Sequence, residues 1–122
     1  MISEDIRVFI LQRLNSIAEL EALLLLWRNP DQDWDIAGLA KRLYISEAVA
    51  CRVLLQLREQ NLVEENNGFY RYGRYSEALG MIVDQLAQLY TTHLIPITNL
   101  IHSKSSSRIQ EFADAFVLRK DK

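Results

Sequence analysis

Only two residues, Tyr44 and Ile45, separate two segments of the chain that each carry the start signal of a helix. Asp35 can cap a short helix that ends just before Tyr44. Ser46 can cap a longer helix that runs to about Gln60. Both side chains can accept a hydrogen bond from the free backbone amides of a first helical turn. Two helices joined this closely are typical of a helix-turn-helix.

Two short strands are expected after these helices. Residues 62–65 and 69–72 are rich in residues that favour strands, and they flank a loop at 66–68. The glycine of this loop permits a positive φ, so we predict a bulged β-hairpin. Tyr70 and Tyr72 alternate with their neighbours along the second strand, so one of the two sets should face the core.

Two further helices are expected before the motif, within residues 1–29. Ser3 opens the first, because its hydroxyl and the acids that follow it suit the free amides and the dipole of a helix N-terminus. Ser16 and Glu19 match a capping box, so the second helix should begin after Ser16 and end before Pro30. Leucines cover more than one face of this second helix. It therefore lies at the centre of the core or partly under another subunit.

A long helix is expected after the hairpin, over residues 76–102. Ser76 can cap it, and Pro96 should kink or restart it because proline lacks the amide hydrogen and its ring disturbs the preceding turn. Apolar residues along this helix alternate by three and four positions, as in the seam of a short coiled coil. The seam consists of Leu79, Ile82, Leu86, Leu89 and His93.

The sequence allows two partners for this seam. Only Glu77 and Asp84 are charged between Ser76 and Ser103, too few to solvate an exposed helix, so a second chain should cover the seam in a homodimer. Packing on the first two helices of the same chain is the alternative. Gly80 costs about 1 kcal/mol in a helix relative to Ala, and we expect close approach of another helix to account for it.

A short amphipathic helix is predicted over residues 106–118, with Ile109, Phe112, Ala113 and Phe116 on its apolar face. It can dock on the body of the chain, on a dimer mate or on a separate partner. The 122 residues have the size of one ordinary domain, so we expect the whole chain to form a single unit.

Composition argues against several classes of protein. The longest apolar run, Ala22–Trp27, is too short to span a membrane, and the first five residues lack the basic start of a signal peptide, so we expect a cytoplasmic protein. Cys51 is the only cysteine, and neither His93 nor His102 has ligand spacing, so we expect no disulfide and no metal site. The glycines have no phosphate-binding spacing, and no acid-base pair is placed for catalysis. We therefore expect neither a cofactor nor an enzyme.

From Trp34 to Gly73 the chain reads WDIAGLAKRLYISEAVACRVLLQLREQNLVEENNGFYRYG. This stretch resembles the winged helix-turn-helix proteins of bacteria, in particular the small dimeric regulators of the MarR and PadR families. The resemblance implies a mainly α fold. In it, a helix-turn-helix and a short two-stranded β-hairpin wing over residues 34–74 are flanked by the N-terminal helices and the long C-terminal helix. It also implies a transcriptional regulator that binds double-stranded DNA as a homodimer.

In such regulators the second helix of the motif enters the major groove of DNA. Ser46 and Arg52 are the hydrogen-bond donors on the corresponding helix here. The other reading positions hold one acid, three aliphatic residues and a thiol, so this recognition helix is unusually apolar. Contacts with phosphates, which hold a duplex without reading its sequence, are implied for four more cations. These are Lys41, Arg42, Arg71 and Arg74.

The charge of the chain is compatible with either a DNA-binding regulator or a module that binds another protein. The net charge of −2 argues against binding through bulk basicity, although residues 36–75 hold six basic and four acidic residues. The alternative to a regulator is a winged-helix interaction module that does not bind DNA and contacts another protein through Val49 and Val53, one helical turn apart. We favour the regulator, because small bacterial winged helices are mostly regulatory.

Overall fold

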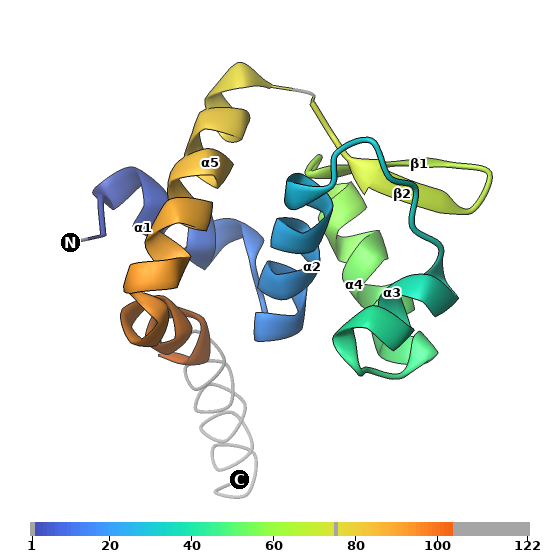
Figure 1. Ribbon diagram of the computed structural model, residues 1–122. Coiled ribbons are helices and arrows are strands. Elements are labelled where there is room, and N and C mark those ends of the chain that lie inside the picture. Colours follow the sequence, from blue (N-terminus) through green and yellow to red (C-terminus); the bar gives the residue numbers. More distant parts are fainter. Residues whose placement is uncertain (1, 75, 104–122) are drawn as a thin grey trace, which may run out of the picture.

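The computed structural model describes residues 2–74 and 76–103 and is mainly helical with one β-hairpin, as predicted. Figure 1 shows α1 and α5 on one side of α2, and α3, α4 and the hairpin on the other. The elements are α1 (Glu4–Arg13), α2 (Ile17–Arg28), α3 (Ile36–Leu43), α4 (Glu47–Glu59), β1 (Val63–Asn66), β2 (Phe69–Tyr72) and α5 (Glu77–Thr92), followed by a helical segment over residues 94–103.

Each of the helices α1 to α5 begins at the capping side chain that the sequence predicts. The oxygen of the cap accepts a hydrogen bond from the backbone amide three residues later, which satisfies one free amide of the first turn. At α2 the Glu19 carboxylate also accepts a hydrogen bond from the amide of Asn15, at 3.0 Å. The caps are Ser3, Ser16, Asp35, Ser46 and Ser76.

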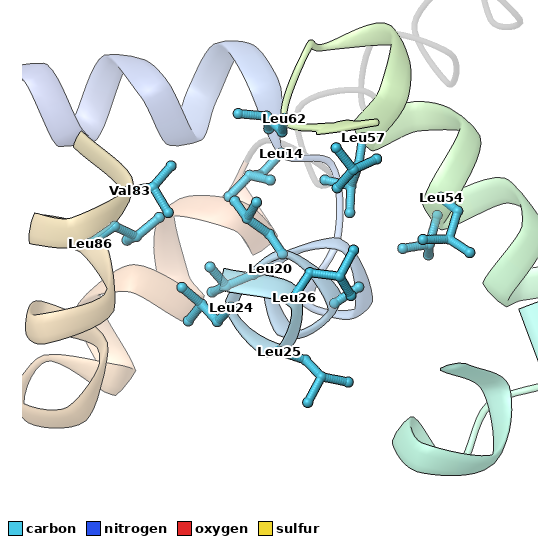
Figure 2. Close-up of a cluster of buried hydrophobic side chains, with 14 of the residues drawn as sticks. Leu14, Leu20, Leu24, Leu25, Leu26, Leu54, Leu57, Leu62, Val83 and Leu86 are labelled. Carbon is cyan, nitrogen blue, oxygen red and sulfur yellow. The ribbon is translucent and has the colours of Figure 1, made fainter. Parts of the chain in front are cut away.

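The leucines of α2 lie at the centre of the hydrophobic core. In Figure 2, Val83 and Leu86 of α5 lie on one side of α2. Leu54 and Leu57 of α4 lie on the other side, and α2 and α4 are in contact. Apolar residues on several faces of α2 are therefore covered within one chain, which decides between the two predicted environments. The completely buried leucines of α2 are Leu20, Leu23, Leu24 and Leu26.

Polar contacts fix α5 along α2. The indole Nε1 of Trp27 donates a hydrogen bond to Oδ1 of Asp84 at 2.6 Å. The hydroxyl of Tyr90 donates to Oε1 of Glu21, also at 2.6 Å. Leu86, at the middle of the predicted seam, is completely buried inside the protomer. Its assignment to a surface shared with a second chain is therefore corrected: at this position the seam packs within one chain.

The predicted effect of Pro96 is confirmed. Helix α5 ends before His93, which has φ −125° and ψ 42°, and a separate helical segment spans residues 94–103. Pro96 lies in the first turn of that segment, where the missing amide hydrogen has no intrahelical partner to lose. The amide of Ile97 bonds to the carbonyl of His93 at 3.1 Å. Two helices thus replace the one expected over residues 76–102.

The wing is a hairpin with a two-residue turn. Strands β1 and β2 pair antiparallel with Asn66 opposite Phe69, which leaves only Asn67 and Gly68 between them. Both turn residues have a positive φ. The predicted three-residue bulged loop is wrong, because an Asn-Gly pair suits the tight turn whose twist matches that of the strands. Tyr70 faces the core, as the alternation along β2 predicts.

An unpredicted β-bridge joins the linker between α2 and α3 to the wing. Trp34 and Tyr70 each donate a backbone hydrogen bond to the carbonyl of the other, at 2.7 Å. Trp34 is only 9% exposed, and its buried indole Nε1 has no hydrogen-bond partner among the described residues. The bridge holds the start of the helix-turn-helix against the wing.

The proposed reason for Gly80 is wrong. A Cβ atom added at Gly80 would have no heavy atom within 4 Å, other than those of its own helix backbone and chain neighbours, so no neighbouring helix approaches closely there. Gly80 is nevertheless the fourth residue of α5, and its amide already bonds to the carbonyl of Ser76 at 3.0 Å. This glycine therefore lowers the stability of the helix without allowing a close contact in return.

The amphipathic helix predicted over residues 106–118 lies outside the described part of the chain. Within residues 2–74 and 76–103, no helix is long and apolar enough to span a bilayer. In the same residues, no group of three or more His, Cys, Asp or Glu side chains is placed to hold a metal ion.

Candidate DNA-binding surface

The turn between α3 and α4 sets the direction in which α4 leaves the motif. Tyr44 adopts φ 58° and ψ 43°, which is the left-handed conformation. The amides of Tyr44 and Ile45 both bond to the carbonyl of Ala40. This is the hydrogen-bonding of a Schellman-like helix end. It allows Ser46 to cap α4 directly after the two-residue turn, with its Oγ 3.1 Å from the amide of Val49.

One face of α4 is open to solvent. Among the predicted reading positions, Ser46, Glu47, Ala48 and Arg52 are exposed, whereas Val49 and Cys51 are half-buried. Val53 is only 4% exposed, and with Ala50, Leu54 and Leu57 it forms the buried face of α4. The predicted protein contact through Val49 and Val53 is therefore corrected, because Val53 packs in the core of the protomer.

Three cations lie on the exposed side of the helix pair. Lys41 and Arg42 are in the last turn of α3, which contains no acid. Arg52 is exposed on α4, whose first turn contains the acid Glu47. No carboxylate in the described part of the chain is within ion-pair distance of Lys41, Arg42 or Arg52. These three charges are therefore available to a partner.

The two cations near the wing, Arg71 and Arg74, differ in whether an acidic side chain pairs with them. The Nε of Arg71 donates a hydrogen bond to Oδ1 of Asp33 at 2.8 Å, and Glu64 lies opposite Arg71 in the hairpin. The hydrogen bond and the charge of Asp33 raise the pKa of the Arg71 guanidinium. Arg74, just after β2, is exposed. The cations predicted to contact phosphates thus include one, Arg71, whose charge is already paired.

Acidic side chains surround much of the wing. Arg58 of α4 forms an ion pair with Glu65, at 3.5 Å. Asp33, Glu64, Glu65 and Arg71 line one hollow beside the hairpin. Positive charge is therefore concentrated on α3 and α4 rather than on the wing.

The remaining residues of the predicted seam on α5 are only partly buried in the protomer. Leu79, Ile82, Leu89 and His93 are half-buried. Leu79 and Ile82 line a groove between α5 and α1. In Figure 1, this side of the molecule is turned away from α3 and α4. Its exposed large apolar side chains are Val8, Met81, Leu94 and Ile95.

Comparisons with known proteins identify the fold. No family model matches the chain, and no curated protein matches it in sequence. A mutant of ZitR from Lactococcus lactis is 19% identical, with a TM-score of 0.52 over 85% of this chain and 74% of that chain. The heme sensor protein PefR from Streptococcus agalactiae, in complex with heme, is 18% identical, with a TM-score of 0.50 over 88% and 78%. The chain thus shares the winged helix-turn-helix fold of these two structures.

Two residues on this surface were missed by the sequence analysis. Tyr44 was treated only as part of a turn, although its side chain is 95% exposed. The shortness of the turn indicated a positive φ nearby, but not which of its two residues would adopt it. Asp33 was not identified as the partner of Arg71, because the two residues are brought together only by the bridge between Trp34 and Tyr70.

Proposed function

We propose that the chain is a DNA-binding transcriptional regulator that acts as a homodimer. The observation that carries the proposal is the cluster of exposed, unpaired cations on the helix pair: Lys41, Arg42 and Arg52. In a helix-turn-helix the first helix crosses the DNA backbone and the second enters the major groove. Lys41 and Arg42 then meet phosphates, and Arg52 reaches a base edge.

Recognition of sequence should be modest. Arg52 can bind the O6 and N7 atoms of a guanine with two hydrogen bonds, and Ser46 can supply a single one. Ala48 and Val49 offer only apolar contacts, which suit a thymine methyl group. Most of the affinity therefore comes from phosphates, and Arg52 supplies most of the discrimination between sequences.

The proposed homodimer forms through the side of the molecule that carries α1, α5 and residues 94–103. Met81 and Ile95 are 63% and 70% exposed, and Leu94 is exposed beside Ile95. Leu79, Ile82, Leu89 and His93, half-buried along α5, would complete the interface. Two copies related by a two-fold axis would place their recognition helices about 34 Å apart, one helical turn of DNA.

The structural relatives support this class of function. ZitR and PefR are winged-helix regulators of the MarR family, and the shared fold agrees with the expectation that the chain is not an enzyme. A regulator of this kind works in the compartment that holds the DNA, so a cytoplasmic location is part of the proposal. The alternative, a protein-binding module, required a contact through Val49 and Val53, and Val53 is buried in the protomer.

A salt titration of DNA binding tests the proposal. The probes are a duplex selected by the protein from a random-sequence pool and a scrambled duplex of the same composition. Each phosphate contact adds about 0.9 to the slope of log affinity against log salt concentration. We expect Lys41→Ala to lower that slope by about this amount on both duplexes. Arg52→Ala should weaken binding to the selected duplex by about 1 to 3 kcal/mol. It should weaken binding to the scrambled duplex much less.

Two further variants serve as controls. Arg7→Ala removes a cation of α1 that is paired with Glu4 at 3.9 Å and lies on the other side of α2, so the slope should be unchanged once sedimentation shows that the variant dimerises like the wild type. Arg71→Ala should lower the slope less than Lys41→Ala, because Arg71 is paired with Asp33. If the wild type binds neither duplex at low salt, the regulator is excluded.

A further inference from the structure

Tyr44 has a backbone conformation that is unfavourable for its residue type. It follows the last residue of α3 and adopts φ 58°, at the position where helices commonly end in glycine. A side chain with a Cβ atom is disfavoured there, and a bulky one is an outlier. The other non-glycine residues with positive φ in the described part of the chain are Asn61 and Asn67, whose residue type tolerates it.

No hydrogen bond or ion pair of the Tyr44 side chain within residues 2–74 and 76–103 compensates for this conformation. The side chain of Tyr44 is 95% exposed, the highest value among the exposed large apolar and aromatic residues. Its hydroxyl has no hydrogen-bond partner within residues 2–74 and 76–103. Glycine or asparagine at this position would fit the same turn with less strain. The chain therefore carries an aromatic side chain here that lowers its stability and is almost fully exposed among the residues that the structure describes.

The residues that precede Tyr44 carry positive charge, which suits the negatively charged backbone of a nucleic acid. Lys41 and Arg42 precede it in the last turn of α3, and both are exposed and unpaired. Ser46 follows it as the exposed cap of α4, and Glu47 is the acid in the first turn of that helix. In Figure 1 this end of α3 lies far from α1 and α5, so a second copy bound there would not cover it.

We propose that Tyr44 is a phosphate-contacting residue at the edge of the major groove, where its hydroxyl donates a hydrogen bond to the DNA backbone. The proposal rests on the proposed function. When α3 crosses the backbone and α4 enters the groove, the turn between them lies beside the phosphates. Tyrosine hydroxyls are among the groups that make such contacts, which fix the register of the protein on the duplex.

Two substitutions of the full-length chain test the proposal with the selected and scrambled duplexes. Tyr44→Phe removes only the hydroxyl and should weaken binding to both duplexes about tenfold, the loss expected for one hydrogen bond to a charged group. The salt slope should not change, because a neutral donor releases no counterion. Tyr44→Asn should bind at least as weakly as Tyr44→Phe, yet unfold at a higher temperature than the wild type, since asparagine tolerates a positive φ.

Tyr90→Phe is the matched control, because it removes a hydroxyl on α5 that bonds to Glu21. Its affinity for DNA should equal that of the wild type. If Tyr44→Phe binds both duplexes like the wild type, the contact is overturned while the regulator stands. In that case, Tyr44 would be assigned to a protein partner. A wild type that binds no duplex at low salt overturns both the contact and the regulator.

Discussion

Gly80 weakens α5, and replacing it should strengthen the protein. Alanine at this position would have no heavy atom within 4 Å to clash with, and it favours a helix by about 1 kcal/mol over glycine. We expect Gly80→Ala to raise the free energy of unfolding by up to about 1 kcal/mol, measured by urea denaturation. Gly68→Ala is the control and should lower it, because Gly68 has φ 84° in the wing turn. A loss of stability in Gly80→Ala would contradict the open space found there.

Residues that act through neighbouring backbone were predictable from the sequence. The cap Ser46 and the break at Pro96 depend only on the amides within one helical turn, so their effects do not require knowledge of the fold. Val53 and Leu86 were misassigned for the opposite reason. The spacing of apolar residues shows that a helix face is covered, but not whether a neighbouring helix or a second molecule covers it. That information lies in contacts between distant parts of the chain.

At the scale of elements, α5 is held against α2 by a hydrogen bond whose strength depends on pH. Burial, together with the hydrogen bond and the charge of Glu21, raises the pKa of the Tyr90 hydroxyl to about 12. The unfolded chain loses this proton near the usual value of about 10. The folded state therefore retains a proton that the unfolded state has lost, and this contribution to stability is present below pH 10 and disappears as the pH rises towards 12.

Tyr90→Phe isolates this contribution. Below about pH 9 the variant should be less stable than the wild type by about 1 kcal/mol, the net value of one hydrogen bond. The difference should shrink between about pH 10 and 12, as the hydroxyl becomes charged beside Glu21 in the wild type. Urea denaturation of both proteins at several pH values measures it. A difference that stays constant across this range would show that the hydroxyl is not held by the carboxylate.

The elements themselves were largely predictable, and their pairing was not. Helix α1 begins at its expected cap, and helices α2 to α4 begin and end close to their expected residues, because caps and proline act locally. The wing turn was assigned one residue too many, since Asn66 fits a loop by its residue type but pairs with Phe69. The bridge between Trp34 and Tyr70 could not be predicted from the sequence, because an isolated pair of residues produces no repeating pattern of apolar positions.

At the scale of the whole molecule, the unpaired cations of α3 and α4 and the most exposed aliphatic side chains lie on opposite sides of α2. Exposed cations gather on α3 and α4, whereas Met81 and Ile95 are exposed on the side that carries α1 and α5. The sequence predicted the cationic motif from its resemblance to regulators. It assigned Leu86 to the dimer seam although Leu86 is completely buried, since a repeat of three and four residues does not distinguish a position that packs on the same chain from a position beside it.

Two substitutions on the outer side test the homodimer. Ile95→Lys and Met81→Lys place a charge on side chains that are 70% and 63% exposed in one chain, so neither should disturb the fold of the protomer. In a two-fold interface each substitution occurs twice, and both lysines must lose water when the chains associate. We expect the dissociation constant of the dimer to rise by at least about tenfold for each variant, measured by sedimentation across a dilution series.

Leu55→Lys supplies the matched control, because Leu55 is an exposed apolar residue of α4 and lies on the DNA-facing half of the molecule. That variant should dimerise like the wild type. Leu86→Lys would be uninformative, since a lysine in the core destabilises the protomer whether or not a dimer forms. A wild type that is monomeric at micromolar concentration, or an Ile95→Lys variant that dimerises as tightly as Leu55→Lys, would exclude this side of the molecule as the interface. Recognition helices could then not be held one turn of DNA apart by α5, and the protein would have to bind a single half-site.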